Sequence, residues 1–224
     1  MRRGGGGRVI RLPRAVLFDW DNTLVDTWPV IHDAMVCTLE AMGHAPWTLE
    51  ETRTRVRKSL REAFPELFGD RWEEARDVFY GRFRAIHLEK LVLQPGAEAL
   101  LEAFQARGCY MGVVSNKMGD HLRREAEHLG WSRYFGRLVG ATDAARDKPA
   151  LEPVVMALGE CGIPPGSDVW FVGDTWIDMQ CAHVAGCIPV LICSDPPKVS
   201  EFKDFMPSIH VSDCHELARL VTSY

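Results

Sequence analysis

Four short apolar runs, each bounded by a polar or small residue, constrain the fold of this chain more than any other feature of its sequence. They are A-V-L-F-D, C-Y-M-G-V-V-S-N, D-V-W-F-V-G-D and C-I-P-V-L-I-C, at residues 15–19, 109–116, 168–174 and 187–193. Such runs are typical of strands that are buried on both faces of a parallel sheet. Weaker runs at 137–140 and 208–211 predict two further strands.

Helical patterns fill the sequence between these strands, and most are followed closely by a glycine suited to a helix C-cap. They cover residues 97–107, 119–129, 151–161 and 177–185. Strands that alternate with helices predict an α/β fold with a doubly wound parallel sheet. Ligands bind such sheets at the carboxyl ends of the strands, so Asp19, Ser115 and Asp174 are expected to converge on one crevice.

One long region breaks the alternation, because residues 27–93 carry only helical patterns. The first pattern has Pro29 in its first turn and ends at Gly43. Capping-box spacing predicts two more helix starts, at Thr48 with Glu51 and at Asp70 with Glu73. We therefore expect an all-helical domain inserted into the α/β fold.

The predicted domain organisation follows from that insertion. The α/β core takes residues 14–26 and 94–224, the helical insertion takes 27–93, and residues 1–13 form a flexible, glycine-rich start.

Composition limits the partners of the chain. A net charge of -5 over 224 residues leaves little long-range attraction for nucleic acid or for an anionic membrane. No apolar stretch reaches the length of a membrane span, and seven scattered cysteines without a C-x-x-C pair are typical of reduced thiols. We expect a cytoplasmic protein that binds neither nucleic acid nor membrane, and the sequence does not indicate an oligomeric state.

The sequence Asp19-Trp20-Asp21-Asn22-Thr23 follows the first predicted strand and places two carboxylates one residue apart. Aspartate and asparagine are also common turn residues, so this cluster alone has a structural interpretation. A calcium-binding loop starts in the same way, but it needs glycine at its sixth position and glutamate at its twelfth. This chain has Leu24 and Val30 there, which excludes an EF-hand.

Three more polar clusters occur further along the chain. They are Ser115-Asn116, Lys148-Pro149, and Gly173-Asp174 with Asp178. Each alone is ordinary turn chemistry or a solvated charge. Their occurrence in this order, close to the strand ends of one sheet, indicates a single site.

This ordered set resembles the four motifs of the haloacid dehalogenase superfamily, matched here by D-W-D-N-T, S-N, K-P and G-D-T-W-I-D. The similarity runs from Ala15 onward. The stretches LQPGAEALLEAFQARG and DMQCAHVAG are similar to the phosphoglycolate-phosphatase-like branch. The resemblance implies a Rossmann-like core, a small helical cap and Mg²⁺-dependent hydrolysis of a small phosphorylated metabolite, a phosphoric monoester.

The resemblance also implies a role for each matched residue. Asp19 would attack phosphorus and form an aspartyl phosphate, and Asp21 would act as general acid and then as general base. Lys148 and Ser115 would hold the phosphoryl oxygens, together with Asn116 and the backbone amides of Trp20 and Asp21.

For the metal, the resemblance implies Asp19, Asp174 and the backbone carbonyl of Asp21 as Mg²⁺ ligands. Asp178 would hold a bound water or orient Lys148, and Thr23 would shape the loop.

Several alternatives stay open. A sugar phosphomutase shares the whole set of catalytic residues, and a catalytically silent binding protein could keep the same fold. A dehalogenase would need neither Mg²⁺ nor Asp21, and a phosphonate hydrolase would need a Schiff-base lysine in the cap, where Lys58 and Lys90 stand in no context that indicates one.

A basic run lies in the cap of this acidic protein. It comprises Arg53, Arg55, Arg57, Lys58 and Arg61. The run is either a solvated helix face or a set of contacts for a second anionic group on the substrate, with Arg57 as the candidate.

Overall fold

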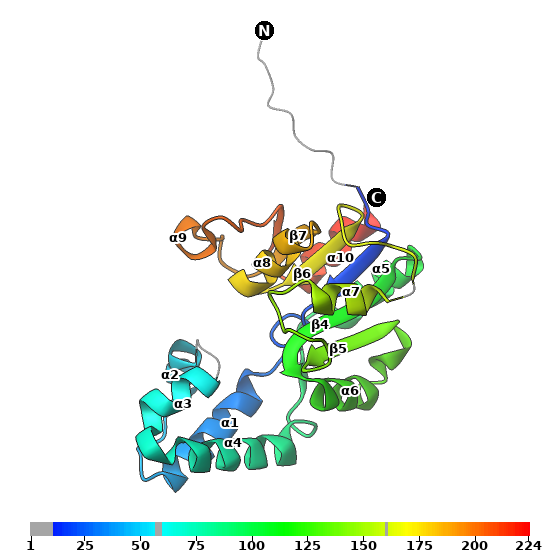
Figure 1. Ribbon diagram of the computed structural model, residues 1–224. Helices are drawn as coiled ribbons and strands as arrows, with labels where there is room; N and C mark the ends of the chain where they lie inside the picture. Colours follow the sequence, from blue (N-terminus) through cyan, green and yellow to red (C-terminus); the bar gives the residue numbers. More distant parts are fainter. Residues whose placement is uncertain (1–10, 57–59, 160) are drawn as a thin grey trace.

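A parallel sheet of six strands forms the core of the molecule in the computed structural model, which describes residues 11–56, 60–159 and 161–224. The strands are β1 (Ala15–Phe18), β4 (Tyr110–Met118), β5 (Arg137–Ala141), β6 (Val169–Gly173), β7 (Ile188–Ile192) and β8 (Ile209–Val211). Their order across the sheet is β5-β4-β1-β6-β7-β8, and every neighbouring pair is parallel (Figure 1). The predicted doubly wound α/β fold is confirmed.

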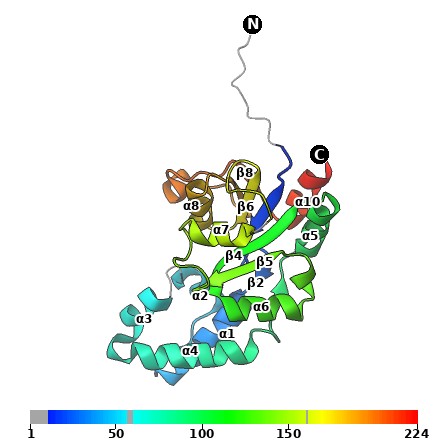
Figure 2. The ribbon, with the colours of Figure 1, turned by 45° about the vertical axis from the view of Figure 1, so that its right-hand side comes forward.

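Helices cover both faces of this sheet (Figure 2). On one face pack α5 (Ala97–Ala106), α6 (Gly119–His128) and α10 (Cys214–Thr222), and on the other α7 (Glu152–Leu158) and α8 (Trp176–Val184). Val16 and Phe18 of β1 contribute to the first apolar layer, whereas Ala15 and Leu17 contribute to the second. A strand covered on both sides has no polar face, which explains its continuous apolar sequence. The short helix α9 (Val199–Phe202) packs beside α8 through Phe202.

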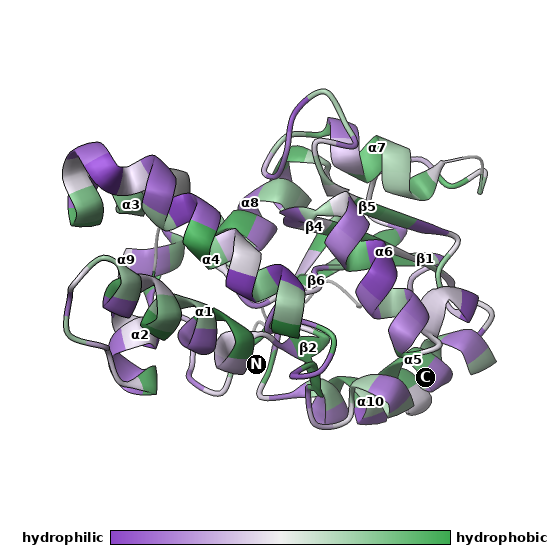
Figure 3. Ribbon diagram, turned by 90° about the horizontal axis from the view of Figure 1, so that it is seen from below, coloured by the Kyte–Doolittle hydropathy of each residue, from purple (hydrophilic) through white to green (hydrophobic). Residues whose placement is uncertain are grey.

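Four α-helices form a separate layer beyond the carboxyl end of β1 (Figure 1). They are α1 (Trp28–Ala41), α2 (Leu49–Arg55), α3 (Leu60–Phe68) and α4 (Trp72–Ile86), with the 3₁₀ turn η1 (Gly69–Arg71) before α4. They enclose their own apolar cluster, which includes Met35, Leu39, Phe64 and Phe79. Figure 3 shows α4 with both hydrophilic and hydrophobic turns, the pattern of a helix that buries one side. We call these helices the cap.

A two-stranded antiparallel ribbon marks both crossings between core and cap. It pairs β2 (Val25–Asp26) with β3 (Val92–Leu93). Each strand has two residues, too few for a periodic pattern, and sequence reasoning missed them. The predicted boundaries after residues 26 and 93 fall at this ribbon. The division into domains stays a prediction, and of the predicted flexible segment, residues 1–10 lie outside the described residues.

Two helix starts predicted in the cap have different outcomes. The capping box at Thr48 is confirmed, because Glu51 N donates to Thr48 Oγ1 at 3.1 Å and Thr48 N donates to Glu51 Oε2 at 2.8 Å. The capping box at Asp70 is wrong, since Asp70 lies inside η1 and α4 starts after Arg71 without a side-chain cap. The chain passes from α3 to α4 through one 3₁₀ turn, which leaves no extended residue in the N-cap conformation.

In the described part of the chain, no helix combines the length and the apolarity that crossing a bilayer requires. All seven cysteines are free thiols, as their scatter in the sequence predicts.

Candidate active site

The register of three central strands brings the predicted site residues to one edge of the sheet. Phe18, the last residue of β1, pairs with Val113 of β4 and with Val172 of β6. Asp19, Ser115 and Asp174 follow these paired residues by one or two positions. Carboxylate oxygens of Asp19, Asp174 and Asp178 lie within 4.8 Å of one another.

Lys148 is the cation of this cluster. Its Nζ donates to Asp19 Oδ1 at 2.6 Å and to Asp178 Oδ1 at 2.7 Å, and all three side chains are buried. Burial disfavours the ammonium form, but the charges of the two carboxylates outweigh it and raise the pKa of Lys148. The two carboxylates therefore favour the charged form of Lys148.

The remaining charge of the cluster is negative and uncompensated. Burial, followed by repulsion from Asp178 and Asp21, raises the pKa of Asp19 to about 6 even though Lys148 opposes the shift. Burial, then the charges of Asp178 and Asp19, raises the pKa of Asp174 well above its usual range. If all three carboxylates were ionised, they would carry two more negative charges than Lys148 balances, and the raised pKa values reflect this repulsion. This donor set fits a hard divalent cation.

Asp178 and Thr23 connect the cluster by hydrogen bonds to the start of α8 and to the loop after β1. Asp178 accepts from Thr175 N at 3.0 Å at the start of α8 and faces Lys148 with its other oxygen. Thr23 Oγ1 donates to Asp174 Oδ1 at 3.1 Å, so the loop after β1 touches the end of β6.

Two predicted phosphate-binding residues make other contacts in the structure. The Asn116 side chain donates to Lys148 O at 3.2 Å and accepts from Lys148 N at 3.0 Å, which links the second and third motifs. Trp20 is fully buried, and its indole Nε1 donates to Glu125 Oε2 at 2.7 Å. Contacts of Asn116 and of the Trp20 and Asp21 amides with a phosphate stay predictions.

Asp21 stands apart from the three-carboxylate cluster, with its side chain about 30% exposed. Its Oδ1 accepts from Thr27 Oγ1 at 2.8 Å and from Lys117 Nζ at 2.7 Å. Thr27 is the residue immediately before α1, so Asp21 is in contact with the entrance to the cap.

Sequence reasoning missed Lys117 and its second partner, Glu125. Lys117 Nζ donates to Glu125 Oε2 at 2.7 Å, and both side chains are buried. Two signals pointed to them. Lys117 follows Ser115 by two positions on a strand, and Glu125 shares the apolar face of α6 with Leu122 and Ala126.

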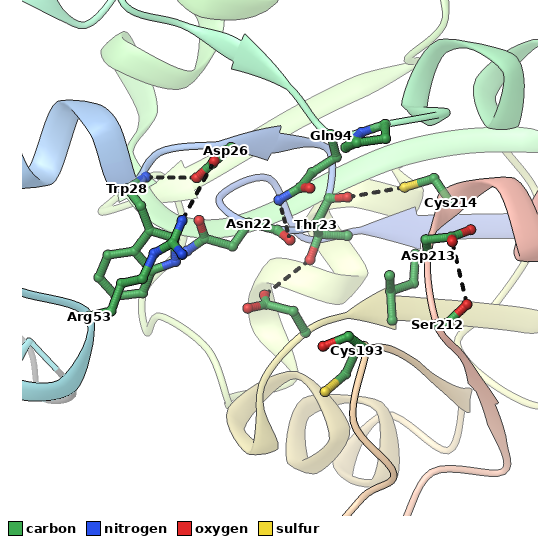
Figure 4. Close-up of a pocket in the computed structure, with 14 residues that line it drawn as sticks. Asn22, Thr23, Asp26, Trp28, Arg53, Gln94, Cys193, Ser212, Asp213 and Cys214 are labelled. Atoms are coloured by element: carbon green, nitrogen blue, oxygen red, sulfur yellow. Dashed lines mark hydrogen bonds and ion pairs between the residues drawn. The ribbon is translucent and has the colours of Figure 1, made fainter. Parts of the chain in front are cut away.

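A pocket of about 390 Å³ lies where the cap meets the core on the Asp174 side of the site. Figure 4 shows Arg53 of α2 stacked beside Trp28, with its guanidinium toward Asp26. The Arg53–Asp26 separation of 3.9 Å is long for an ion pair, and about half of the Arg53 side chain is exposed. Arg57 and Lys58 of the basic run lie outside the described residues.

Comparisons with known proteins show the family of this chain. Residues 16–192 match the model of the family described as haloacid dehalogenase-like hydrolase. A phosphoglycolate phosphatase of Xylella fastidiosa is 33% identical over 178 residues, which cover 78% of this chain and 77% of that protein.

Solved structures give the same result. A haloacid dehalogenase superfamily hydrolase from Ehrlichia chaffeensis is 29% identical, with a TM-score of 0.66 over 95% of this chain and 98% of that one. A haloacid dehalogenase-like hydrolase from Streptococcus pneumoniae shares the fold at 21% identity, with a TM-score of 0.81 over 93% of this chain and 98% of that one.

Proposed function

The chain belongs to the haloacid dehalogenase-like hydrolases and is a phosphatase acting on phosphomonoesters, and we propose that it uses Mg²⁺ and carries the phosphoryl group on Asp19. The observation that carries this proposal is the cluster of the Asp19, Asp174 and Asp178 carboxylates, of which Asp19 and Asp178 pair with the buried Lys148. Asp21 follows Asp19 by two residues and keeps about 30% of its side chain exposed, and we assign it the acid/base role.

The proposed reaction has two steps. In the first, a carboxylate oxygen of Asp19 bonds to phosphorus, the ester P–O bond breaks, and the leaving oxygen takes a proton from Asp21. In the second, Asp21 takes a proton from water as that water attacks phosphorus. The bond between phosphorus and Asp19 breaks, inorganic phosphate leaves, and both aspartates return to their starting forms.

Mg²⁺ would be held by Asp19, Asp174 and the backbone carbonyl of Asp21, and it would neutralise charge on the transferred group. Lys148 supplies a fixed positive charge beside Asp19, and it is held there by Asp178. Ser115, a buried residue of β4, would donate its hydroxyl hydrogen to a phosphoryl oxygen.

The substrate we propose is a small phosphomonoester with a second anionic group. The relatives from Xylella fastidiosa and Xanthomonas campestris are named for phosphoglycolate, which carries a carboxylate. Arg53 supports the same class, because it is a half-exposed cation in the pocket that Asp174 also lines. Arg57, the residue indicated by the sequence, stays a candidate for the same role.

Turnover of 2-phosphoglycolate and p-nitrophenyl phosphate, with Mg²⁺ and with a chelator, tests this function. We expect release of inorganic phosphate from both substrates with Mg²⁺ only. Transfer of phosphate between positions of a sugar phosphate without release would indicate a phosphomutase. Binding without turnover of any phosphomonoester would indicate a catalytically silent protein.

A further inference from the structure

Asp21 is joined to a buried network of ion pairs. The other members of this network, Lys117 and Glu125, have no role in the reaction proposed above. Lys117 stands at its centre, with its side chain 4% exposed and its Nζ 2.7 Å from both Asp21 Oδ1 and Glu125 Oε2. The Phe83 ring of α4 lies 5.5 Å from the same Nζ. Burial acts against the ammonium charge, but Asp21 and Glu125 outweigh it and raise the pKa of Lys117. Lys117 thus joins Asp21 to Glu125 through its ammonium group.

Glu125 is held from two further directions. His87 Nδ1 lies 2.8 Å from Glu125 Oε1, and Trp20 Nε1 donates to Oε2. Trp20 precedes Asp21 in the chain, and His87 directly follows α4 at the end of the cap. The Glu125 side chain is fully buried, so it has little freedom to follow a moving partner. Lys117 is thus attached to a rigid point of the core.

The consequence for Asp21 concerns its orientation. Lys117 and Thr27 both donate to Oδ1, and within the described ranges no hydrogen bond reaches Oδ2. One oxygen is therefore held while the other is left for proton transfer. A misplaced acid/base group loses much of its effect, because proton transfer requires hydrogen-bonding distance to the reacting oxygen.

We propose that Lys117 is a positioning residue that holds Asp21 in place for proton transfer, with Glu125 as its anchor. This inference rests on the proposed phosphatase function and deepens it. The alternative is a purely structural ion pair, in which Lys117 only compensates the buried charge of Glu125. The two interpretations differ in which step of the reaction a variant slows.

The test uses the double variant Lys117→Met/Glu125→Gln. Methionine keeps the volume beside Phe83, and glutamine can still hydrogen-bond to His87 and Trp20, so no unpaired charge is left buried. The single variant Lys117→Met leaves Glu125 charged, and it serves as the comparison for stability. Lys90→Met is the matched control, because Lys90, in the turn after α4, also pairs with a carboxylate, that of Asp33 in α1.

The measurement is rapid mixing with p-nitrophenyl phosphate and steady-state turnover of 2-phosphoglycolate. p-Nitrophenolate leaves without needing a proton, so its first release depends little on Asp21, whereas hydrolysis of the aspartyl phosphate requires Asp21 as base. In the double variant we expect steady-state kcat to fall by on the order of 10²-fold for both substrates. For p-nitrophenyl phosphate, whose first step is unaffected, KM should fall with kcat and kcat/KM should stay close to that of wild type. The ratio of the first-turnover rate to the steady-state rate should rise at least about tenfold over wild type.

An unchanged ratio overturns the inference, whether the two rates stay at the wild-type level or fall together in a folded variant. Failure of the wild-type protein to hydrolyse either substrate is a separate result, because it removes the proposed function and the inference with it.

Discussion

The core site and the cap differ in how deeply their ion pairs are buried. In the core, Lys148 and Lys117 are buried and each is held by two carboxylates. In the cap, ion pairs such as Arg55–Glu51 and Arg71–Glu74 lie within one helix or turn and are about half exposed. Exposed pairs are screened and weak, whereas a buried charge that loses its partner is costly. Changes in the core should therefore alter the chemical step, and changes in the cap should alter substrate binding.

The strongest test of this contrast is Asp19→Asn. The amide has a similar volume but is a poor nucleophile, so turnover should fall by on the order of 10⁴-fold or more while circular dichroism stays unchanged. Asp70→Asn, the same change on the exposed 3₁₀ turn of the cap, should leave the rate unaltered. Activity of Asp19→Asn within tenfold of wild type would mean that another group is the nucleophile.

Asp21→Asn should have the next largest effect, a loss of turnover of about 10² to 10⁴-fold. The backbone carbonyl at this position is unchanged, so we expect Mg²⁺ affinity, measured by calorimetric titration, to remain close to that of wild type. Asp174→Ala provides the comparison, because it removes a carboxylate of the cluster. Equal losses of Mg²⁺ affinity in the two variants would contradict the assignment of Asp21 as an acid/base group.

Asp174→Asn tests how repulsion among the carboxylates of the core site affects stability. The raised pKa of Asp174 means that its contribution to stability is present at low pH and is lost as the pH rises above the usual range of an aspartate. Without metal, the variant should therefore melt above wild type at pH 7.5 and at the same temperature near pH 4.

Mg²⁺ should reverse that order. At about 100 times its dissociation constant, bound Mg²⁺ stabilises wild type by about 2.7 kcal/mol, equivalent to roughly 5–10 °C in Tm, and the variant should gain less. A lower Tm for the variant in chelator at pH 7.5 would show that repulsion among the carboxylates does not limit stability.

The smallest expected effect belongs to the cap. Arg53→Ala should raise KM for 2-phosphoglycolate about fivefold, as expected for an exposed charge pair worth roughly 1 kcal/mol, and should leave p-nitrophenyl phosphate unaffected. Arg55→Ala is the matched control, because Arg55 pairs with Glu51 and stacks over Trp47 at 4.9 Å. The same change in KM for both substrates, or no change for either, would mean that Arg53 is only a solvated residue of α2.

The sheet, the helical insertion and the first set of candidate site residues could be predicted from the sequence by itself. These features depend on local signals. A strand that is buried on both faces must be apolar throughout, and the residue that follows it must lie at the edge of the sheet. The burial of β1 and the convergence of Asp19 with Asp174 follow directly from those signals. The strands β2 and β3 of the ribbon were too short to produce such a signal.

Only the tertiary structure decided the partners of Lys117 and Glu125. Lys117 meets Asp21, 96 residues away along the chain, and Glu125 meets His87 at the end of the cap. A buried charge is stable only beside its opposite, and that requirement says nothing about where in the sequence the opposite charge stands. The local pattern can place a lysine on a strand, but only the packing of α4, α6 and the loop after β1 around it decides which carboxylates it holds.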